Sequence, residues 1–277
     1  MLRKDYSYKK LAQSLLKRLL KLHRENFASD KSFKIKTTIV KTCPFEFPFE
    51  NYRANSPETR WEFNVHFRDA INEYWAKLEE ERDDDALYEL GKWMVKTVGD
   101  ISGNDEKNLE RYVRKARSHY TVVEKDDRVS SYSKILAAKD RYKYQILDTR
   151  VAASLNILQL NYFGSRRYYI PVVDPRSNSL KDFNKVFPCS AFLANGFKLI
   201  PKTLNIAEYT FYTEIVNEMA RIAKEDALFI ECMLFAYAPI LTQDFNELQK
   251  KFDEDTMRAK ARDEYWRSRG VYRGIGG

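Results

Sequence analysis

The sequence predicts a mainly α-helical protein with a small strand-bearing portion near its N-terminus. Over most of the 277 residues, apolar side chains recur at the three- and four-residue spacing of helices. A helix-start signal stands at Ser56 and Pro57, where a capping hydroxyl precedes a proline. The clearest strand candidate is SFKIKTTIVK at 32–41, which alternates apolar and polar residues. We therefore expect an N-terminal helix and strand portion at 1–55 and a helical domain at 56–277, or one continuous domain.

The first predicted helix is amphipathic and basic. Its apolar stripe consists of four leucines at helical spacing: Leu11, Leu15, Leu19 and Leu22. Basic residues stand between them: Lys10, Lys17, Arg18 and Lys21. Such a helix either packs its leucines on the protein core, which is the usual arrangement, or lies on an anionic membrane. After the strand at 32–41, the proline-containing segment 43–57 predicts an irregular connection.

Helices dominate from Ser56 onward. The helix that begins there has an apolar stripe of five residues: Trp61, Val65, Ile71, Trp75 and Leu78. The acidic run at 79–85 ends it, and we interpret this run as a solvated turn because it lacks the spacing of a calcium loop. Further helices are predicted at 85–98, 104–120, 206–238 and 253–270.

The composition favours a folded protein with an anionic partner. The chain has 48 Lys and Arg against 40 Asp and Glu, a formal net charge of +8, and 44% hydrophobic residues. This positive excess favours a polyanion such as nucleic acid, and the apolar fraction is ample for a core. The N-terminus lacks an apolar signal core and no run is long enough to span a bilayer. We therefore expect a cytoplasmic protein without membrane segments.

Several enzyme classes lack their sequence signatures in this chain. Its nine glycines form neither a phosphate-binding loop nor a dinucleotide-binding fingerprint. The three cysteines, Cys43, Cys189 and Cys232, form no C-x-x-C pair, which argues against a zinc site and a disulfide framework. The three histidines stand without a metalloprotease motif, and no serine-hydrolase motif is present. The sequence thus offers few sites for metal or serine chemistry.

Asp148 is the first candidate catalytic residue. It follows Ile146 and Leu147 and precedes the apolar run that starts at Val151, so it stands where a helix N-cap belongs. A capping carboxylate is held ionised by the positive end of the helix. Capping alone explains the residue. An ionised, fixed aspartate also stabilises the oxocarbenium-like transition state of a reaction at a sugar carbon.

Lys134 is the second candidate, and it stands 14 residues before Asp148 on a short predicted helix. Tyr132, Ile135 and Leu136 are expected to form the inward face of that helix. A lysine amine that loses its proton attacks an electrophilic sugar carbon and forms a Schiff base. The alternative is an ordinary solvated lysine beside an apolar stripe.

The stretch 133–160 resembles the active-site segment of helix-hairpin-helix DNA glycosylases. The similarity is carried by S-K-I-L-A and by I-L-D-T-R-V-A-A-S-L, and it is greatest with the 8-oxoguanine DNA glycosylase branch and its bacterial relatives. In that family a lysine attacks C1′ of the target nucleotide and an aspartate at the next helix stabilises the developing charge. Lys134 and Asp148 match these positions, and Thr149 and Val151 match the residues beside the aspartate.

The resemblance implies that the enzyme extrudes a nucleotide from duplex DNA and holds it with cations and aromatic side chains. Six basic residues are expected to contact DNA: Arg150, Lys139, Arg141, Lys143, Arg166 and Arg167. Four aromatic residues are expected to contact the base: Tyr162, Phe163, Tyr168 and Tyr169. The alternative for the segment 161–171 is that its aromatic residues pack in the core and its arginines are merely solvated.

The resulting hypothesis is a DNA glycosylase that excises a damaged or modified base, with lyase activity if Lys134 is the nucleophile. The resemblance implies no metal and no organic cofactor, and we expect a monomer that acts in DNA repair or in defence against phages with modified DNA. Two alternatives stay open. One is a nucleic-acid-binding protein without catalysis, and the other is a helical interaction or regulatory protein.

Overall fold

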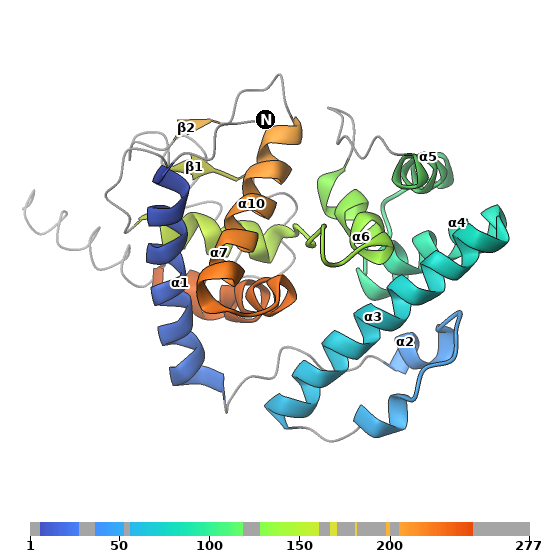
Figure 1. The fold of residues 1–277 in the computed structure, drawn as a ribbon, viewed down its shortest axis with the longest axis horizontal. Coiled ribbons are helices and arrows are strands. Elements are labelled where there is room, and N and C mark those ends of the chain that lie inside the picture. The colour runs from blue at the N-terminus through green and yellow to red at the C-terminus, as the bar shows by residue number, and fades with distance from the viewer. Residues whose placement is uncertain are drawn as a thin grey trace, which may run out of the picture.

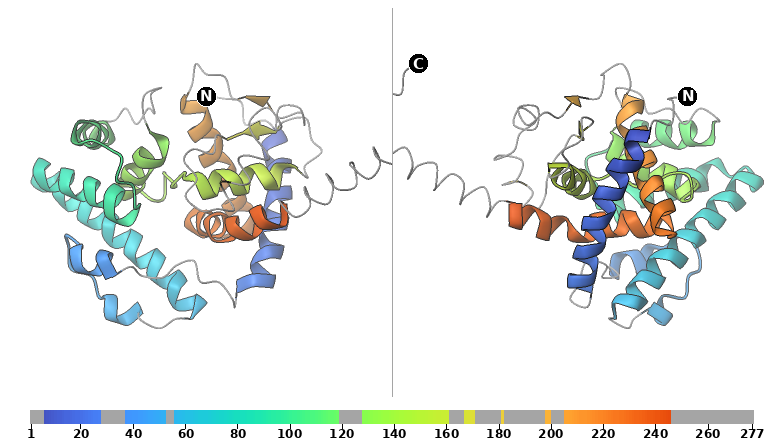
Figure 2. Two further views of the ribbon diagram at one scale, coloured as in Figure 1. Left: turned by 180° about the vertical axis from the view of Figure 1, so that it is seen from behind. Right: turned by 60° about the vertical axis from the view of Figure 1, so that its left-hand side comes forward.

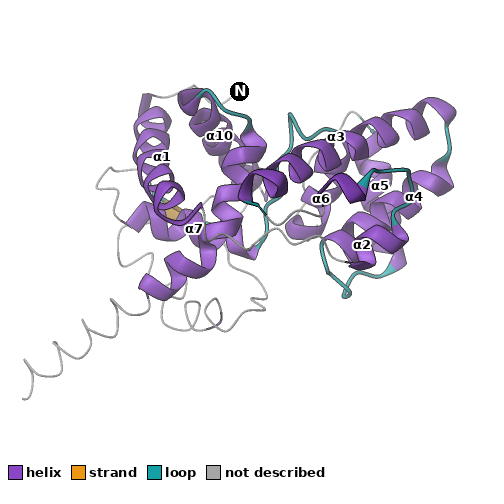
Figure 3. Ribbon diagram, turned by 90° about the horizontal axis from the view of Figure 1, so that it is seen from below, coloured by secondary structure: helices purple, strands orange, loops and turns teal. Residues whose placement is uncertain are grey.

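The structure is a computed structural model that describes residues 6–27, 37–52, 56–118, 128–160, 167–170, 181, 198–199 and 205–245. These residues are mostly helical, as predicted, and they form two groups of helices (Figures 1 and 3). The first group contains α1 (Tyr6–Asn26), α7 (Thr149–Leu160), α10 (Asn205–Ala223) and the helix Ala227–Phe245. The second contains α2 (Thr37–Thr42), the 3-10 turn η2 (Phe49–Tyr52), α3 (Pro57–Glu81), α4 (Asp84–Trp93), the π-helical turn η3 (Met94–Val98), α5 (Glu106–Arg117) and α6 (Val129–Lys139).

Helix α1 is amphipathic as predicted, and its leucines are part of the core. Leu11, Leu15 and Leu19 are buried where α1 packs on α7 and α10 (Figure 2). The Arg18 guanidinium donates a hydrogen bond of 3.2 Å to the carbonyl of Leu158, near the end of α7. The apolar face is therefore occupied by protein and not turned toward a membrane. Helix α1 thus shares a core with helices that come much later in the chain.

Helix α3 begins and ends at the predicted signals. The Ser56 hydroxyl accepts a hydrogen bond of 3.1 Å from the backbone N–H of Thr59, and Pro57 follows it as the first helical residue. At the other end Arg82 adopts a left-handed conformation with φ 56°. Asp83 then caps α4 by accepting from the N–H of Ala86 at 2.9 Å. The acidic run is therefore a turn between two helices.

The strand predicted at 32–41 is wrong over its second half. Thr37–Thr42 form helix α2, while 32–36 lie outside the described residues. The spacing from Ile35 to Ile39 is also the spacing of a helix, and Ile39 is buried. The Trp93 indole donates a hydrogen bond of 2.9 Å to the Thr42 hydroxyl, so tertiary contacts hold α2 against α4. The strands in the described residues are β1 (Tyr168–Tyr169) and β2 (Lys198–Leu199), which pair in parallel.

The long helix predicted at 206–238 is two helices. Helix α10 ends at Ala223, and Lys224 then adopts a left-handed conformation with φ 59°. The Asp226 carboxylate accepts a hydrogen bond of 2.8 Å from the N–H of Leu228 and so caps the next helix. The helix predicted at 253–270 lies outside the described residues.

Among the described residues, the helix Ala227–Phe245 is the one that is long and apolar enough to cross a membrane by length and composition. The same test is passed by the core helix of a soluble protein, and 61% of this stretch is buried inside the protein. Its Glu231 forms an ion pair with Arg68 of α3 at 3.4 Å, and both side chains are buried. The helix therefore packs as an interior element of the fold.

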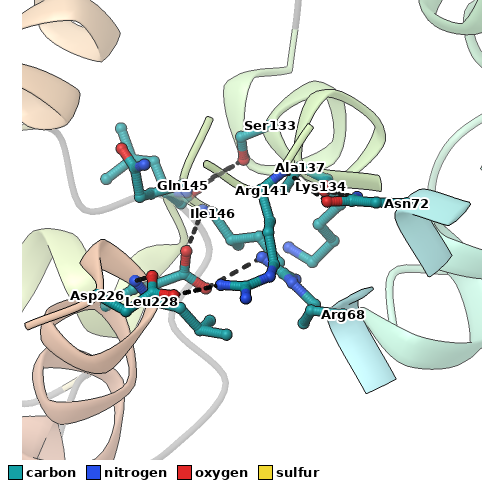
Figure 4. Close-up of polar contacts among 12 residues, drawn as sticks. Arg68, Asn72, Ser133, Lys134, Ala137, Arg141, Gln145, Ile146, Asp226 and Leu228 are labelled. Carbon is teal, nitrogen blue, oxygen red and sulfur yellow. Dashed lines mark hydrogen bonds and ion pairs between the residues drawn. The ribbon is translucent and has the colours of Figure 1, made fainter. Parts of the chain in front are cut away.

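The two groups of helices are joined by the segment Asp140–Asp148, which runs from α6 to α7 (Figure 1). Arg141 lies in this segment with only 3% of its surface exposed. Its guanidinium binds Asp69 of α3 through Nε. A second nitrogen binds Asp226 at 2.6 Å (Figure 4). Burial alone lowers the pKa of Arg141, and the hydrogen bonds and charges of Asp69 and Asp226 raise it above its ordinary value. One buried cation thus connects both groups.

We expect Arg141→Met to lower the free energy of unfolding by about 3 kcal/mol, because two carboxylates lose their buried partner. This is the low end for a broken buried ion pair, since the Asp69 and Asp226 side chains keep 31% and 29% exposure. Denaturant unfolding measures the change. Lys77→Met, which removes an exposed pair with Glu81, is the matched control and should change stability by less than about 1 kcal/mol. Equal effects of the two substitutions would contradict the assignment.

Candidate active site

The candidate site is built on Tyr144–Asp148, a segment that is neither helix nor strand and is mostly buried. Such a segment needs partners for its backbone polar groups, because burying them unpaired is costly. The partners are side chains of distant elements. The Tyr209 hydroxyl donates to the carbonyl of Gln145 at 2.8 Å, and the Tyr212 hydroxyl donates to that of Ile146 at 2.7 Å. The segment is therefore held firmly where α10 meets it.

Burial keeps these two phenols in the form that can donate. It raises the pKa of Tyr209 and of Tyr212 well above the ordinary value, and the charge of Glu231 acts in the same direction. Both hydroxyls therefore stay protonated at neutral pH. The contacts of α10 with this segment do not depend on pH in the physiological range.

Asp148 lies at the end of the segment and caps α7, as the sequence predicts. Its Oδ1 accepts a hydrogen bond of 2.9 Å from the N–H of Val151, and its carbonyl accepts from the N–H of Ala152 at 2.9 Å. The residue is partly exposed. Its carboxylate thus has a fixed direction at the positive end of a helix while part of its surface stays accessible.

Lys134 is buried, with 6% of its surface exposed, which excludes the ordinary solvated lysine. Its Nζ donates to the carbonyl of Ser130 at 2.8 Å and contacts the Ser130 hydroxyl at 3.3 Å. The aliphatic part of the side chain lies against Gly99, directly after the π-helical turn η3. A Cβ atom at Gly99 would stand 2.5 Å from Cδ and Cε of Lys134. The glycine therefore makes room for the lysine.

The two candidate residues are linked through their neighbours in sequence. The Ser133 hydroxyl accepts a hydrogen bond of 3.1 Å from the N–H of Leu147 and lies 3.4 Å from the carbonyl of the same residue. Ser133 precedes Lys134, and Leu147 precedes Asp148. The structure thus joins α6 to the start of α7 at the positions next to the candidate pair.

Glu231 is a residue of this site that the sequence hypothesis missed. Its carboxylate accepts a hydrogen bond of 2.7 Å from the N–H of Ile146 and pairs with Arg68. The pKa of Glu231 is raised above its ordinary value, mainly by burial and to a smaller extent by the charge of Asp148. Arg68, the Ile146 N–H and Lys134 act in the opposite direction without cancelling this increase. The pKa of Glu231 therefore depends on the charges of both Asp148 and Lys134. Its signal in the sequence is a lone carboxylate within the apolar run 227–238.

Two predicted DNA contacts are structural residues instead. Arg141 is buried between Asp69 and Asp226, so its guanidinium is not available to a phosphate. The Nζ of Lys139 donates to the carbonyl of Ala116 in the last turn of α5 at 2.6 Å and pairs with Glu79 at 3.4 Å. Both predictions are corrected for the same reason. The sequence shows that these residues are basic, but it does not show that carboxylates of distant helices pair with them in the fold.

The other predicted basic contacts that the structure describes remain predictions. Lys143 is exposed, and its Nζ stands 5.1 Å from the centre of the Tyr144 ring. Arg150 is partly exposed and lies over the ring of Phe235 at 4.6 Å. Arg167 is partly buried just before β1, and Arg166 lies outside the described residues. Of these, Arg150 is the nearest in sequence to the Asp148 cap.

The predicted aromatic contacts fall into two sets. Tyr162 and Phe163 lie outside the described residues. Tyr169 is part of the hydrophobic core, and Tyr168 packs its ring 5.0 Å from that of Phe211. The backbone of Tyr168 is held by the Gln159 amide of α7, at 2.9 and 3.0 Å. These two tyrosines form β1 and pack against the helices, which is the alternative stated above.

Among the described residues, no group of three or more His, Cys, Asp or Glu side chains could hold a metal ion. Comparison of the chain with protein-family models, with curated proteins and with solved structures finds no match. The chemistry of the site is therefore argued from its own residues. They are a fixed carboxylate at a helix start, a buried lysine on the adjoining helix, and a second, buried carboxylate behind them.

Glu231 gives the site a testable pH dependence. Because its pKa is raised in the folded protein, the unfolded chain loses this proton first, as pH rises through about 4.3. The contribution of Glu231 to the free energy of unfolding is therefore greatest below that pH and decreases as the pH rises toward the pKa of Glu231 in the folded protein. We expect the stability of the wild type to decline relative to Glu231→Gln from about pH 4.3 upward. Denaturant unfolding between acidic and neutral pH measures it.

The control for this experiment is Glu80→Gln on the exposed side of α3. It removes an exposed carboxylate, so it measures how far the loss of any glutamate from the chain alters stability between acidic and neutral pH. A wild-type advantage that grows with pH would mean that the attraction of Arg68 outweighs the burial of the carboxylate.

Proposed function

We propose that this protein is a DNA glycosylase that cleaves the N-glycosidic bond of a damaged or modified base. The observation that carries the proposal is the hydrogen bond of 3.1 Å that the N–H of Leu147 donates to the Ser133 hydroxyl. It holds the neighbours of Lys134 and Asp148 together across the junction of α6 and α7. An amine and a carboxylate presented from two adjoining helices can act on the same sugar.

Asp148 is the electrostatic part of the proposed mechanism. Departure of the base leaves positive charge on C1′ and the ring oxygen, and a fixed carboxylate stabilises it without having to reorient. The Val151 N–H holds Oδ1 of Asp148 in place. The clamped segment, which is Tyr144–Asp148 with two carbonyls bound by tyrosines of α10, keeps the cap from shifting. Preorganisation of this kind is what makes a charge effective in catalysis.

Lys134 is the proposed nucleophile. The Lys134 ammonium first gives up a proton. The resulting amine attacks C1′, the bond from C1′ to the base nitrogen breaks, and the base departs with that electron pair and takes up the proton that the alkylated amine releases. Opening of the sugar ring then gives an imine, the species from which a lyase cleaves the strand. To reach a nucleotide, Nζ leaves the carbonyl of Ser130, which it binds at 2.8 Å. It also leaves the Ser130 hydroxyl, which it contacts at 3.3 Å.

DNA as partner is supported by the charge of the exposed face of α1. Four exposed basic residues follow one another at spacings of seven, four and three, so they share one face: Lys10, Lys17, Lys21 and Arg24. This basic stripe lies on α1, which packs against α7 and binds the carbonyl of Leu158 near the C-terminal end of α7. Cations along a helix face suit the regular phosphates of a duplex.

The test of the function is Asp148→Asn. Asparagine caps helices about as well as aspartate, so the fold should keep its stability while the negative charge is lost. We expect the rate of base release to fall by about 100- to 1000-fold, with the melting temperature and the DNA affinity near those of wild type. The measurement is mass spectrometry of bases released from duplexes with oxidised, alkylated, deaminated or phage-type modified bases.

Asp148→Ala is the matched control, because it removes both the charge and the cap. It should lose activity to the same extent and also lose about 1 kcal/mol of stability. Base release by Asp148→Asn at the wild-type rate would instead make Asp148 a structural cap, and the protein a nucleic-acid-binding protein without this chemistry.

Lys134 is tested separately by trapping with borohydride. The wild type should form a covalent adduct with DNA, and Lys134→Ala should form none, because the imine needs the amine. Lys139→Ala is a suitable control, since it removes a nearby lysine that is bound to Glu79 and Ala116. If Lys134→Ala released bases at the wild-type rate, the nucleophile would be a water molecule and not Lys134. The proposed role of Asp148 would be unchanged.

A further inference from the structure

Gln145, in the clamped segment, has a buried side-chain amide without a hydrogen-bond partner among the described residues. Its side chain has no exposed surface, and neither Oε1 nor Nε2 makes a hydrogen bond to the part of the chain that the structure describes. Its backbone carbonyl, in contrast, is bound by the Tyr209 hydroxyl at 2.8 Å. The main chain at this position is thus satisfied and fixed, while the amide group is not.

The unpaired amide contrasts with two other fully buried amides nearby in the sequence. Asn156 binds the N–H and the carbonyl of Ile170 at 2.9 and 2.7 Å. Gln159 binds the same two groups of Tyr168 at 2.9 and 3.0 Å. In each case the acceptor oxygen and the donor nitrogen of the amide are both used. Helix α7 therefore shows how this fold satisfies a buried amide when its role is structural.

An amide buried without partners destabilises the protein, because it has lost its hydrogen bonds to water and gained none. The cost is high enough that such groups are rare in native proteins and call for an explanation. Gln145 stands three residues before Asp148 and beside Ile146, whose N–H is bound by Glu231 (Figure 4). The buried Gln145 amide at this place in the chain is explained if a bound ligand supplies the hydrogen-bond partners that the protein does not.

We propose that the Gln145 amide binds the hydrogen-bonding edge of the extruded base and selects it. An amide presents an acceptor oxygen and two N–H donors side by side, which matches a base edge with an adjacent donor and acceptor, as adenine has at N6 and N7. This inference rests on the proposed glycosylase function and names the chemistry by which that site recognises its substrate. Because the Gln145 side chain has no exposed surface in the unliganded protein, binding of a base requires the side chains packed around the amide to move apart.

The test is Gln145→Met, which keeps the length of the side chain and removes both hydrogen-bonding groups. Without the unpaired amide, the unliganded variant should melt about 2 to 6 °C higher than wild type. Its rate of base release should fall by about 10- to 100-fold. Its affinity for a duplex that already contains an abasic site, where no base is read, should stay within about twofold of wild type.

Gln159→Met is the matched control, since it removes an amide of the same size and burial that is fully bonded. It should lower the melting temperature, because the backbone groups of Tyr168 lose their partners. A Gln145→Met protein that melts below wild type, or fails to fold, overturns the inference, because the amide is then bonded within the protein.

The remaining outcomes separate this inference from the proposed function. Base release by Gln145→Met at the wild-type rate overturns the inference alone and leaves the glycosylase proposal standing. A wild type that releases no base from any duplex of the panel overturns the proposed function, and the inference with it.

Discussion

The buried guanidinium of Arg141 is the interaction on which the arrangement of the site depends. It binds Asp69 of α3 and Asp226 at the start of the last described helix, so it joins the two groups of helices. Asp226 uses its other carboxylate oxygen to cap that helix. The position of Arg141 therefore fixes the beginning of the segment that leads to Asp148. Without this ion pair, the two groups could shift relative to each other and the cap of α7 would move with them.

The junction of the two groups is polar, which a fold chosen for stability alone avoids. Arg68 and Lys134 bring two buried cations to it, and Glu231 brings one buried carboxylate. Figure 4 shows Lys134 and Arg68 extending into this interior region from α6 and α3. Apolar residues of similar volume often replace such buried ions without loss of stability. The proposed function would give a reason for buried ionisable groups around a fixed cap.

Local signals in the sequence predicted the parts of the fold that local interactions determine. The caps at Ser56 and Asp148 and the leucine stripe of α1 are examples, because each depends on residues within a few positions. Residues 37–41 were predicted wrongly, since contacts such as that of Trp93 with Thr42 decide their conformation. The roles of Arg141 and Glu231 depend on partners 72 to 163 residues away in the sequence. No spacing rule reveals such partners.

Asp148 unites a structural role and an electrostatic one, and the two are compatible because they use different properties of the carboxylate. The hydrogen bond from Val151 needs an acceptor oxygen, which asparagine also supplies. The negative charge acts further, since it raises the pKa of Glu231 and of Tyr212 in the interior. The field of Asp148 thus reaches the region where Lys134 is buried. In the proposed reaction that charge would stabilise the cation at C1′, whereas the helix needs only the cap.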